Sequence, residues 1–259
     1  MSTYQSNTTY AEAARRIESA KRVLITTHTK PDGDAVGSTL ALARALHNRK
    51  QTADVYLMGP LESSLALLAA PTPYQMVEKN KLGEEYDLVV ITDTGSWSQL
   101  EPLAAWLKSR HDRIIIFDHH AHGDDVGSMR IVNSKAASST QVLVPLLDEM
   151  KCELTRGSGC IAEALFVGLA TDTGWFQYEN ANAEAFALAA RLLACDVEKS
   201  RLYQNIEENF GTQRLALQAR ALASLEYAGN GSVAIQTLRI ENFKAAGAKA
   251  EDLTNLINV

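Results

Sequence analysis

The chain has 259 residues, of which 46% are hydrophobic, and a formal net charge of −6. This length and apolar content suit one large α/β domain, or one main domain with a smaller appendage. The mild negative charge argues against a broad grip on long duplex DNA, which requires many cationic side chains on phosphates. No apolar run approaches the roughly 20 residues of a membrane span, and the polar N-terminus has no apolar signal core. We therefore expect a cytoplasmic protein without a membrane partner.

Apolar strands alternate with helices in the first half of the chain. Strands are expected over residues 22–27, 53–58, 87–92, 113–117 and 129–132, and helices over residues 9–20, 36–48, 61–69 and 100–108. Strands that are apolar throughout predict an α/β fold, in which a doubly wound parallel sheet is flanked by helices. In such sheets ligands bind beyond the carboxyl ends of the strands.

The second half of the chain is mainly helical. Apolar residues have helical spacing over residues 140–150, 160–171, 183–193 and 197–227, and an Asn230-Gly231 turn precedes a strand over residues 232–238. We expect a catalytic α/β domain over residues 1–195, a helical linker over residues 196–229 and the start of a second α/β domain over residues 230–259. This last segment is too short to bury a core of its own.

The first polar motif, HTKPDGD, follows the first strand and contains His28, Asp32 and Asp34. Pro31 imposes an extended turn, in which two aspartates two positions apart point in different directions. They could therefore serve two different metal ions. A purely structural alternative is that Asp34 caps the next helix while Asp32 forms the turn.

Two further motifs end later strands, namely ITDTGS with Asp93 and IIIFDHH with Asp118, His119 and His120. A carboxylate has two oxygens, so Asp93 could bridge two metals, unless it merely caps the following turn. Adjacent histidines beyond a strand point to opposite sides, so that one could bind metal while its neighbour faces the substrate.

The last candidate ligand is Asp172 in GLATDTGW, for which a solvent-facing position at a helix end is the alternative. If all these motifs meet, five carboxylates and three imidazoles share one small volume, where like charges repel. Two divalent cations would remove the conflict. Carboxylate and imidazole ligands without a thiolate favour manganese or magnesium, with zinc or cobalt also compatible. The natural substrate of such a dinuclear site is a phosphate ester.

The motifs HTKPDGDAVGS, ITDTGS, IIIFDHH and ATDTGW resemble, in this order, the four motifs of the DHH phosphoesterase superfamily. The resemblance spans about residues 10–227, and the PDGDAxGS form is closest to the nanoRNase and 3′-phosphoadenosine 5′-phosphate phosphatase group. It implies hydrolysis of short single-stranded oligonucleotides or 3′,5′-bisphosphorylated nucleosides (pAp) by a hydroxide that bridges two cations, Mn²⁺ first and Mg²⁺ as the alternative. Two other functions stay open: a pyrophosphatase or polyphosphatase of the same superfamily, and a catalytically weak metal- and nucleotide-binding module.

The resemblance also implies a role for each candidate residue. One metal would be held by His28, Asp32 and Asp93, and a second by Asp34, Asp93, His119 and Asp172. His120 would contact the phosphate or protonate the leaving oxygen, and Asp118 would orient the imidazoles through a hydrogen bond.

One part of the family pattern is missing. The second domain of this group, called DHHA1, carries a glycine-rich GGGH segment that grips the terminal nucleotide, and this sequence contains no such segment. The piece from residue 230 resembles only the opening of a DHHA1 domain. We therefore expect either a chain truncated at Val259 or a substrate half that is missing or supplied by a partner. The sequence identifies no substrate-binding residue and leaves the oligomeric state open, a homodimer being one option.

Overall fold

The computed structural model describes residues 4–78, 80, 82–83, 85–157, 159–209 and 211–253. The chain forms two compact units, Met1–Leu202 and Tyr203–Val259, and each is described by itself. The predicted division at residues 195 and 229 stays a prediction. Within the described part of the chain, no helix has both the length and the apolar character that crossing a bilayer requires.

The first unit is built on a six-stranded parallel sheet with the order β3-β2-β1-β4-β5-β6. Its strands are β1 (Arg22–Thr29), β2 (Thr52–Met58), β3 (Tyr74–Met76), β4 (Leu88–Thr92), β5 (Ile114–Asp118) and β6 (Met129–Val132). The direction of winding reverses between β1 and β4, which confirms the predicted α/β doubly wound fold. Strand β3 was not predicted, because a three-residue edge strand after two prolines is too short to produce a pattern.

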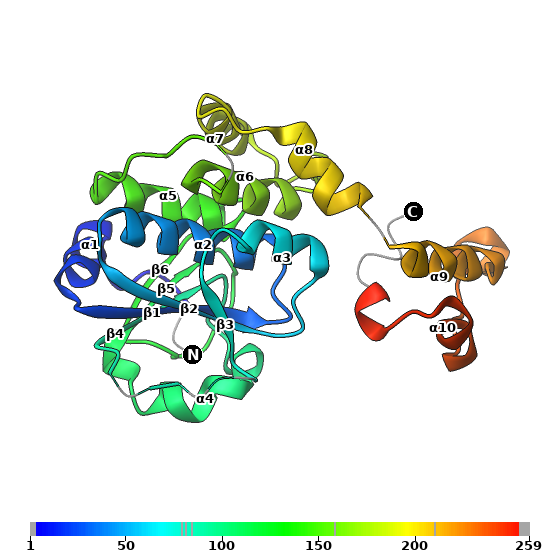
Figure 1. The fold of residues 1–259 in the computed structure, drawn as a ribbon, viewed down its shortest axis with the longest axis horizontal. Coiled ribbons are helices and arrows are strands. Elements are labelled where there is room, and N and C mark those ends of the chain that lie inside the picture. Colours follow the sequence, from blue (N-terminus) through cyan, green and yellow to red (C-terminus); the bar gives the residue numbers. More distant parts are fainter. Residues whose placement is uncertain are drawn as a thin grey trace. The chain divides into compact units, whose positions relative to one another are not determined.

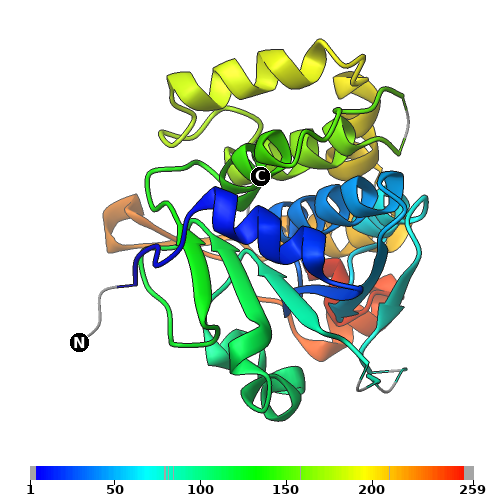
Figure 2. The ribbon, with the colours of Figure 1, turned by 90° about the vertical axis from the view of Figure 1, so that its left-hand side faces the viewer.

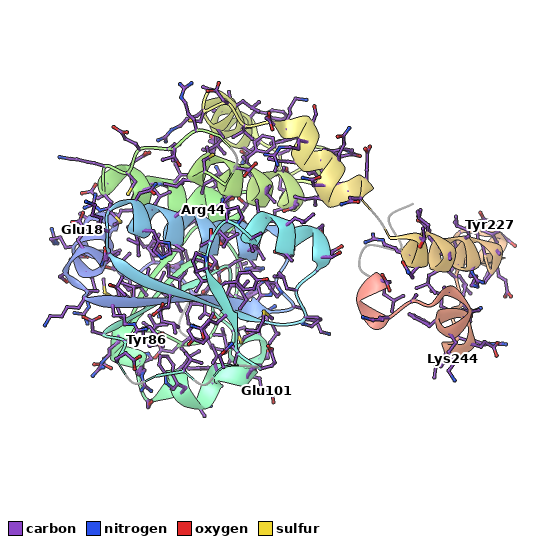
Figure 3. All side chains as sticks on the ribbon, in the orientation of Figure 1. Glu18, Arg44, Tyr86, Glu101, Tyr227 and Lys244 are labelled. Atoms are coloured by element: carbon purple, nitrogen blue, oxygen red, sulfur yellow. The ribbon has the colours of Figure 1, made fainter. Side chains whose placement is uncertain are left out.

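Helices cover both faces of this sheet. The α-helices of this part of the chain are α1 (Tyr10–Ser19), α2 (Gly33–Asn48), α3 (Ser63–Ala69), α4 (Glu101–Lys108), α5 (Ser139–Glu149), α6 (Ile161–Asp172), α7 (Ala183–Leu193) and α8 (Lys199–Tyr203), of which α7 packs on α6. Figure 1 shows α1, α2, α5 and α6 on one side of the sheet and α4 on the other. A core under α4 includes Leu24, Tyr86, Val89, Leu103 and Ile116, and Figure 3 labels Tyr86 within it.

The second unit contains α9 (Thr212–Ala223), α10 (Ile240–Ala246) and a two-stranded antiparallel sheet of β7 (Glu226–Ala228) and β8 (Val233–Ile235). The helical stretch predicted over residues 197–227 is therefore wrong at its end, and it is also divided, since one helical segment ends at Glu208 and α9 begins at Thr212. Helical spacing is overridden there because residues 226–228 pair with β8 across a turn in which Asn230 has a φ of 56°. The predicted turn at Asn230 is confirmed, and of the strand predicted over residues 232–238 the structure forms β8, residues 233–235.

Helices α2 and α6 cross at unusually close range, and a glycine makes this approach possible. A Cβ atom added to Gly37 would lie 2.5 Å from the carbonyl oxygen of Ala164 and 3.0 Å from the backbone nitrogen of Gly168. Both neighbours are backbone atoms of α6, so they cannot move without moving the helix. The contact matters for function because α2 begins, and α6 ends, with candidate metal ligands.

We expect Gly37→Ala to lower the free energy of unfolding by about 1–3 kcal/mol, since overpacking must push α2 and α6 apart. Urea denaturation measures the change. Gly211→Ala is the matched control, because Gly211 has a φ of −61° and an added Cβ meets only the flexible end of Gln213 at 3.1 Å. Equal stability of Gly37→Ala and the wild type would contradict the close contact.

Candidate metal centre

The site lies at the carboxyl edge of the sheet, at the point between β1 and β4 where the winding reverses. His28 is near the end of β1, where the register with β2 shifts between Thr26 and Thr29. Asp93 directly follows β4, and Asp118 is the last residue of β5. The parallel strands therefore deliver these side chains to one edge, which is where doubly wound sheets bind ligands.

Two helix N-termini shape the site further. Asp32 is the N-cap of α2, and its Oδ1 accepts hydrogen bonds from the backbone N–H groups of Asp34 (3.1 Å) and Ala35 (3.0 Å). Asp34 is buried and accepts backbone hydrogen bonds from Ser139 and Thr140, at the N-terminus of α5. The alternative role considered for Asp34, helix capping, thus belongs to Asp32, because the residue before the first turn is the one whose side chain reaches the free N–H groups.

The first group of ligand atoms comes from His28, Asp32 and Asp93. Nε2 of His28 is 3.4 Å from Oδ2 of Asp93 and 3.9 Å from Oδ1 of Asp32. All three ligand atoms lie within 4.8 Å of one another. Asp93 itself has a φ of 63°, a left-handed conformation that aspartate tolerates better than most residues.

The second group comes from Asp34, His119 and Asp172, again within 4.8 Å of one another. Nε2 of His119 is 3.4 Å from Oδ2 of Asp172 and 4.0 Å from Oδ2 of Asp34. The same nitrogen is 3.5 Å from Oδ1 of Asp93, whereas Nε2 of His28 is 3.4 Å from Oδ2 of that residue. Asp93 therefore presents one oxygen to each group, which is the arrangement that a bridging carboxylate needs.

These separations fit shared cations. Atoms bound to one cation at about 2.1 Å lie about 3.0 Å apart when adjacent and about 4.2 Å apart when opposite in an octahedron. The rings are also held as metal-binding histidines usually are, with the second nitrogen on a carbonyl oxygen. Nδ1 of His28 donates to the carbonyl of Thr29 (2.8 Å), and Nδ1 of His119 to that of Ala136 (3.4 Å). The residues present thus fit a pair of divalent cations.

The charges in the site conflict when no cation balances them. Burial raises the pKa of Asp34, and burial together with the charge of Asp34 raises the pKa of Asp93 well above its usual value. Burial, followed by the charges of Asp34 and Asp32, raises the pKa of Asp172 to about 8. Each carboxyl group is therefore easier to ionise once a cation is near.

Asp118 and His120 form a separate pair beside these groups. Oδ1 of Asp118 accepts hydrogen bonds from Nδ1 (2.7 Å) and the backbone N–H (3.1 Å) of His120, and Oδ2 accepts one from the Tyr4 hydroxyl (2.7 Å). Burial alone would raise the pKa of Asp118, but the bonds from His120 and Tyr4 outweigh it and lower the pKa. The hydrogen bond that Nδ1 of His120 donates to Asp118 raises the pKa of His120.

The side chains of His119 and His120 lie close together but have different hydrogen-bond partners. Their ring centroids are 4.6 Å apart with an interplanar angle of 63°, so the prediction that they point to opposite sides is wrong. The reason is that β5 ends at Asp118 and the alternation of a strand ends with it. Asp93 and both histidines also place ligand atoms within 4.8 Å, but Nδ1 of His120 is already bonded to Asp118.

Sequence reasoning missed two residues that support the site. The Ser139 hydroxyl donates to Oδ1 of Asp93 (2.9 Å), while its backbone N–H holds Asp34. Tyr4 reaches Asp118 from the N-terminal segment. The SSTQ stretch carried a weak signal, since Ser138 caps α5, but nothing local indicated which carboxylates these residues would meet.

Comparison with known proteins identifies the chain. The profile described as "DHH family, N-terminal domain" matches residues 22–169, more than half of the sequence. The chain belongs to the DHH family. As a member of this family, the protein is a hydrolase of phosphate esters.

Curated relatives of the DHH protein align over most of its length. It is 27% identical over 228 residues to the probable bifunctional oligoribonuclease and PAP phosphatase NrnA of Streptococcus mutans, covering 88% of this chain and 70% of that one. It is 24% identical over 251 residues to the bifunctional oligoribonuclease and PAP phosphatase NrnA of Bacillus subtilis, covering 95% and 76%. An exopolyphosphatase-related protein from Bacteroides fragilis has the same fold, with a TM-score of 0.88, 22% identity, and coverage of 96% and 75%.

We expect the affinity of this DHH protein for Mn²⁺ to rise about ten-fold per pH unit between about pH 6 and about pH 8 for each proton that the cation displaces. The sign follows from the raised pKa of Asp172: below about 8 the carboxyl group holds a proton that the cation must remove. Isothermal titration calorimetry at several pH values measures the slope. Asp172→Asn lacks this proton, so its affinity for Mn²⁺ should rise less steeply with pH. A wild-type affinity that does not change with pH would contradict the prediction.

Proposed function

We propose that this hydrolase of phosphate esters cleaves short single-stranded oligonucleotides and 3′,5′-bisphosphorylated nucleosides with the help of two divalent cations. Mn²⁺ is the first choice, because carboxylate and imidazole donors without thiolate suit it, and Mg²⁺ is the alternative. The observation that carries the proposal is the position of Asp93. Its two oxygens lie 3.4 Å from His28 and 3.5 Å from His119, so one buried carboxylate serves both ligand groups.

The substrate class is supported by the relatives rather than by a pocket. Proteins named oligoribonuclease and PAP phosphatase align with 88% and 95% of this chain. Their named substrates share a phosphate ester next to a nucleoside, in a small molecule with few phosphates. A chain with a net charge of −6 can bind such a ligand through cations in the site, because the ions reverse the sign of the local potential.

Seven side chains of the site take different parts in the proposal. His28, Asp32 and Asp93 would hold one cation, and Asp34, Asp93, His119 and Asp172 would hold the other. When bound, the two cations supply charge neutralisation for the phosphate and activation of water. Neutral hydrogen-bond donors hold two of the carboxylates in place. The backbone N–H groups of Ser139 and Thr140 bind Asp34, and the Ser139 hydroxyl binds Asp93.

His120 is proposed as the residue that gives a proton to the leaving oxygen. Its Nδ1 is bonded to Asp118 at 2.7 Å, which favours the protonated ring and leaves Nε2 as the nitrogen that can reach substrate. The side chain is 49% exposed, against 17% for that of His119. A group that donates a proton to a leaving alcohol needs this combination of access and retained proton.

A panel of hydrolysis assays tests the proposal. We expect Mn²⁺-dependent release of phosphate from pAp and of mononucleotides from dinucleotides, with much slower cleavage of pyrophosphate and polyphosphate. Asp93→Ala is the control, since both cations lose their shared ligand and activity and metal content should fall together. Faster cleavage of pyrophosphate than of either nucleotide would favour the pyrophosphatase alternative. No turnover in any assay would favour a binding module.

We expect His120→Ala to keep its metal content while kcat falls about 10²–10⁴-fold, the usual contribution of a general acid. The loss should be smaller for a p-nitrophenyl nucleotide ester, because p-nitrophenolate leaves without needing a proton. Metal analysis and paired assays on pAp and the ester provide the measurement. If metals are lost instead, the roles of His119 and His120 are reversed, and equal losses on both substrates would move His120 from the leaving oxygen to the phosphate.

A further inference from the structure

The N-terminal segment, residues 4–7, lies along the outer side of edge strand β6. The Asn7 N–H donates to the carbonyl of Arg130 (3.1 Å), and the Arg130 N–H donates to Oδ1 of Asn7 (2.7 Å). The Ser6 hydroxyl donates to the carbonyl of Val132 (3.0 Å) and accepts its N–H (2.9 Å). Figure 2 shows the dark blue N-terminal segment beside the green strands. These bonds occupy polar groups that an edge strand would otherwise expose, and they place Tyr4.

Tyr4 sits in a niche that two glycines leave open. A Cβ atom at Gly95 or at Gly123 would overlap the Tyr4 side chain. The guanidinium of Arg130 lies 6.0 Å from the centre of the ring. From this niche the hydroxyl reaches Oδ2 of Asp118 at 2.7 Å. The niche therefore fits an aromatic side chain that carries a hydrogen-bond donor at its end.

We infer that Tyr4 is a positioning residue, whose hydroxyl holds Asp118 in the orientation that aims His120 at the substrate. The catalytic part of this inference rests on the proposed function, whereas the contact itself rests on the hydrogen bonds. Asp118 is fully buried, and its two oxygens are divided between two partners. Tyr4 therefore acts on the reaction through two other side chains and touches no reacting atom.

Asp118 needs a second hydrogen-bond partner because the carboxylate of an aspartate can rotate. The last torsion of an aspartate side chain has broad preferences, so a single bonded oxygen does not fix the plane of the group. With Oδ2 held by Tyr4, Oδ1 has one direction in which to accept the Nδ1 proton of His120. A ring that can tilt instead places Nε2 at variable distances from the leaving oxygen, and displacements of about 1 Å can cost about 10²-fold in rate.

Tyr4→Phe tests this chain of contacts, because it keeps the ring and removes the donor. We expect kcat on pAp to fall about 10- to 100-fold, while KM and metal content stay near the wild-type values. The matched control is Tyr10→Phe, which removes a hydroxyl that donates to the carbonyl of Val142 (3.0 Å), and it should keep full activity. In a His120→Ala background, Tyr4→Phe should cause no further loss, since residues that act as one unit are not additive.

Two kinetic outcomes would overturn the inference. One is a wild-type kcat in Tyr4→Phe, and the other is an equal loss with and without His120, which would indicate a merely structural role. Loss of bound metal in Tyr4→Phe would also overturn it, because the contact would then support the cations rather than His120.

A spectroscopic measurement separates this inference from the proposed function. The Nδ1 proton of His120, bonded to a carboxylate, should give a far-downfield proton NMR signal in the metal-free protein, assigned by its absence in His120→Ala. The signal should shift or broaden in Tyr4→Phe and stay unchanged in Tyr10→Phe. If the wild type hydrolyses none of the substrates but the signal responds, the proposed function fails and the positioning contact stands. A signal that ignores Tyr4→Phe overturns the inference whatever the activity.

Discussion

Repulsion among buried carboxylates is the constraint on which the rest of the site depends. Asp34 and Asp93 are 1% and 2% exposed, so neither charge is relieved by water. Nε2 of His119 lies 3.5 Å from Oδ1 of Asp93, and neutral donors also hold the two carboxylates, namely the backbone N–H groups of Ser139 and Thr140 and the Ser139 hydroxyl. Such donors orient a carboxylate but do not cancel its charge, and an uncompensated buried charge is costly. Cations bound at this site would balance these charges.

The sheet makes this crowding possible because it places the ligands on rigid elements. The winding reverses between β1 and β4, and the ends of these two strands carry His28 and Asp93. Asp93 in the site has a φ of 63°, and Trp175 and Phe176, which follow Asp172 in the chain, have φ values of 55° and 69°. Strained residues of this kind persist only where the surrounding structure holds them in place.

The sequence predicted the parts of this arrangement that depend on local patterns. Apolar strands identified the parallel sheet, and since such strands end at one edge, the positions of His28, Asp93 and Asp118 after their strands were enough to assign them to a common site. The contacts of Ser139 and Tyr4 could not be predicted, because their partners Asp34 and Asp118 are 105 and 114 positions away. A serine before a helix or a tyrosine near a terminus carries no local sign of such a partner. Strand β3 escaped prediction because three residues are too few to show a period, and β7 because the residues before and within it have helical spacing.

The chemical role of each histidine in the site depends on the group that accepts the hydrogen bond from its Nδ1. Nδ1 of His28 and of His119 must donate to the carbonyls of Thr29 and Ala136, because a carbonyl oxygen can only accept, and this aims Nε2 at the carboxylates. Nδ1 of His120 meets the charged carboxylate of Asp118 instead, which raises the pKa of the ring. In the proposed function, His119 would thus be a cation ligand and His120 an acid. The division depends on which acceptor the loop after β5 supplies, so the Asp-His-His order of the motif has a physical basis beyond the number of ligands it provides.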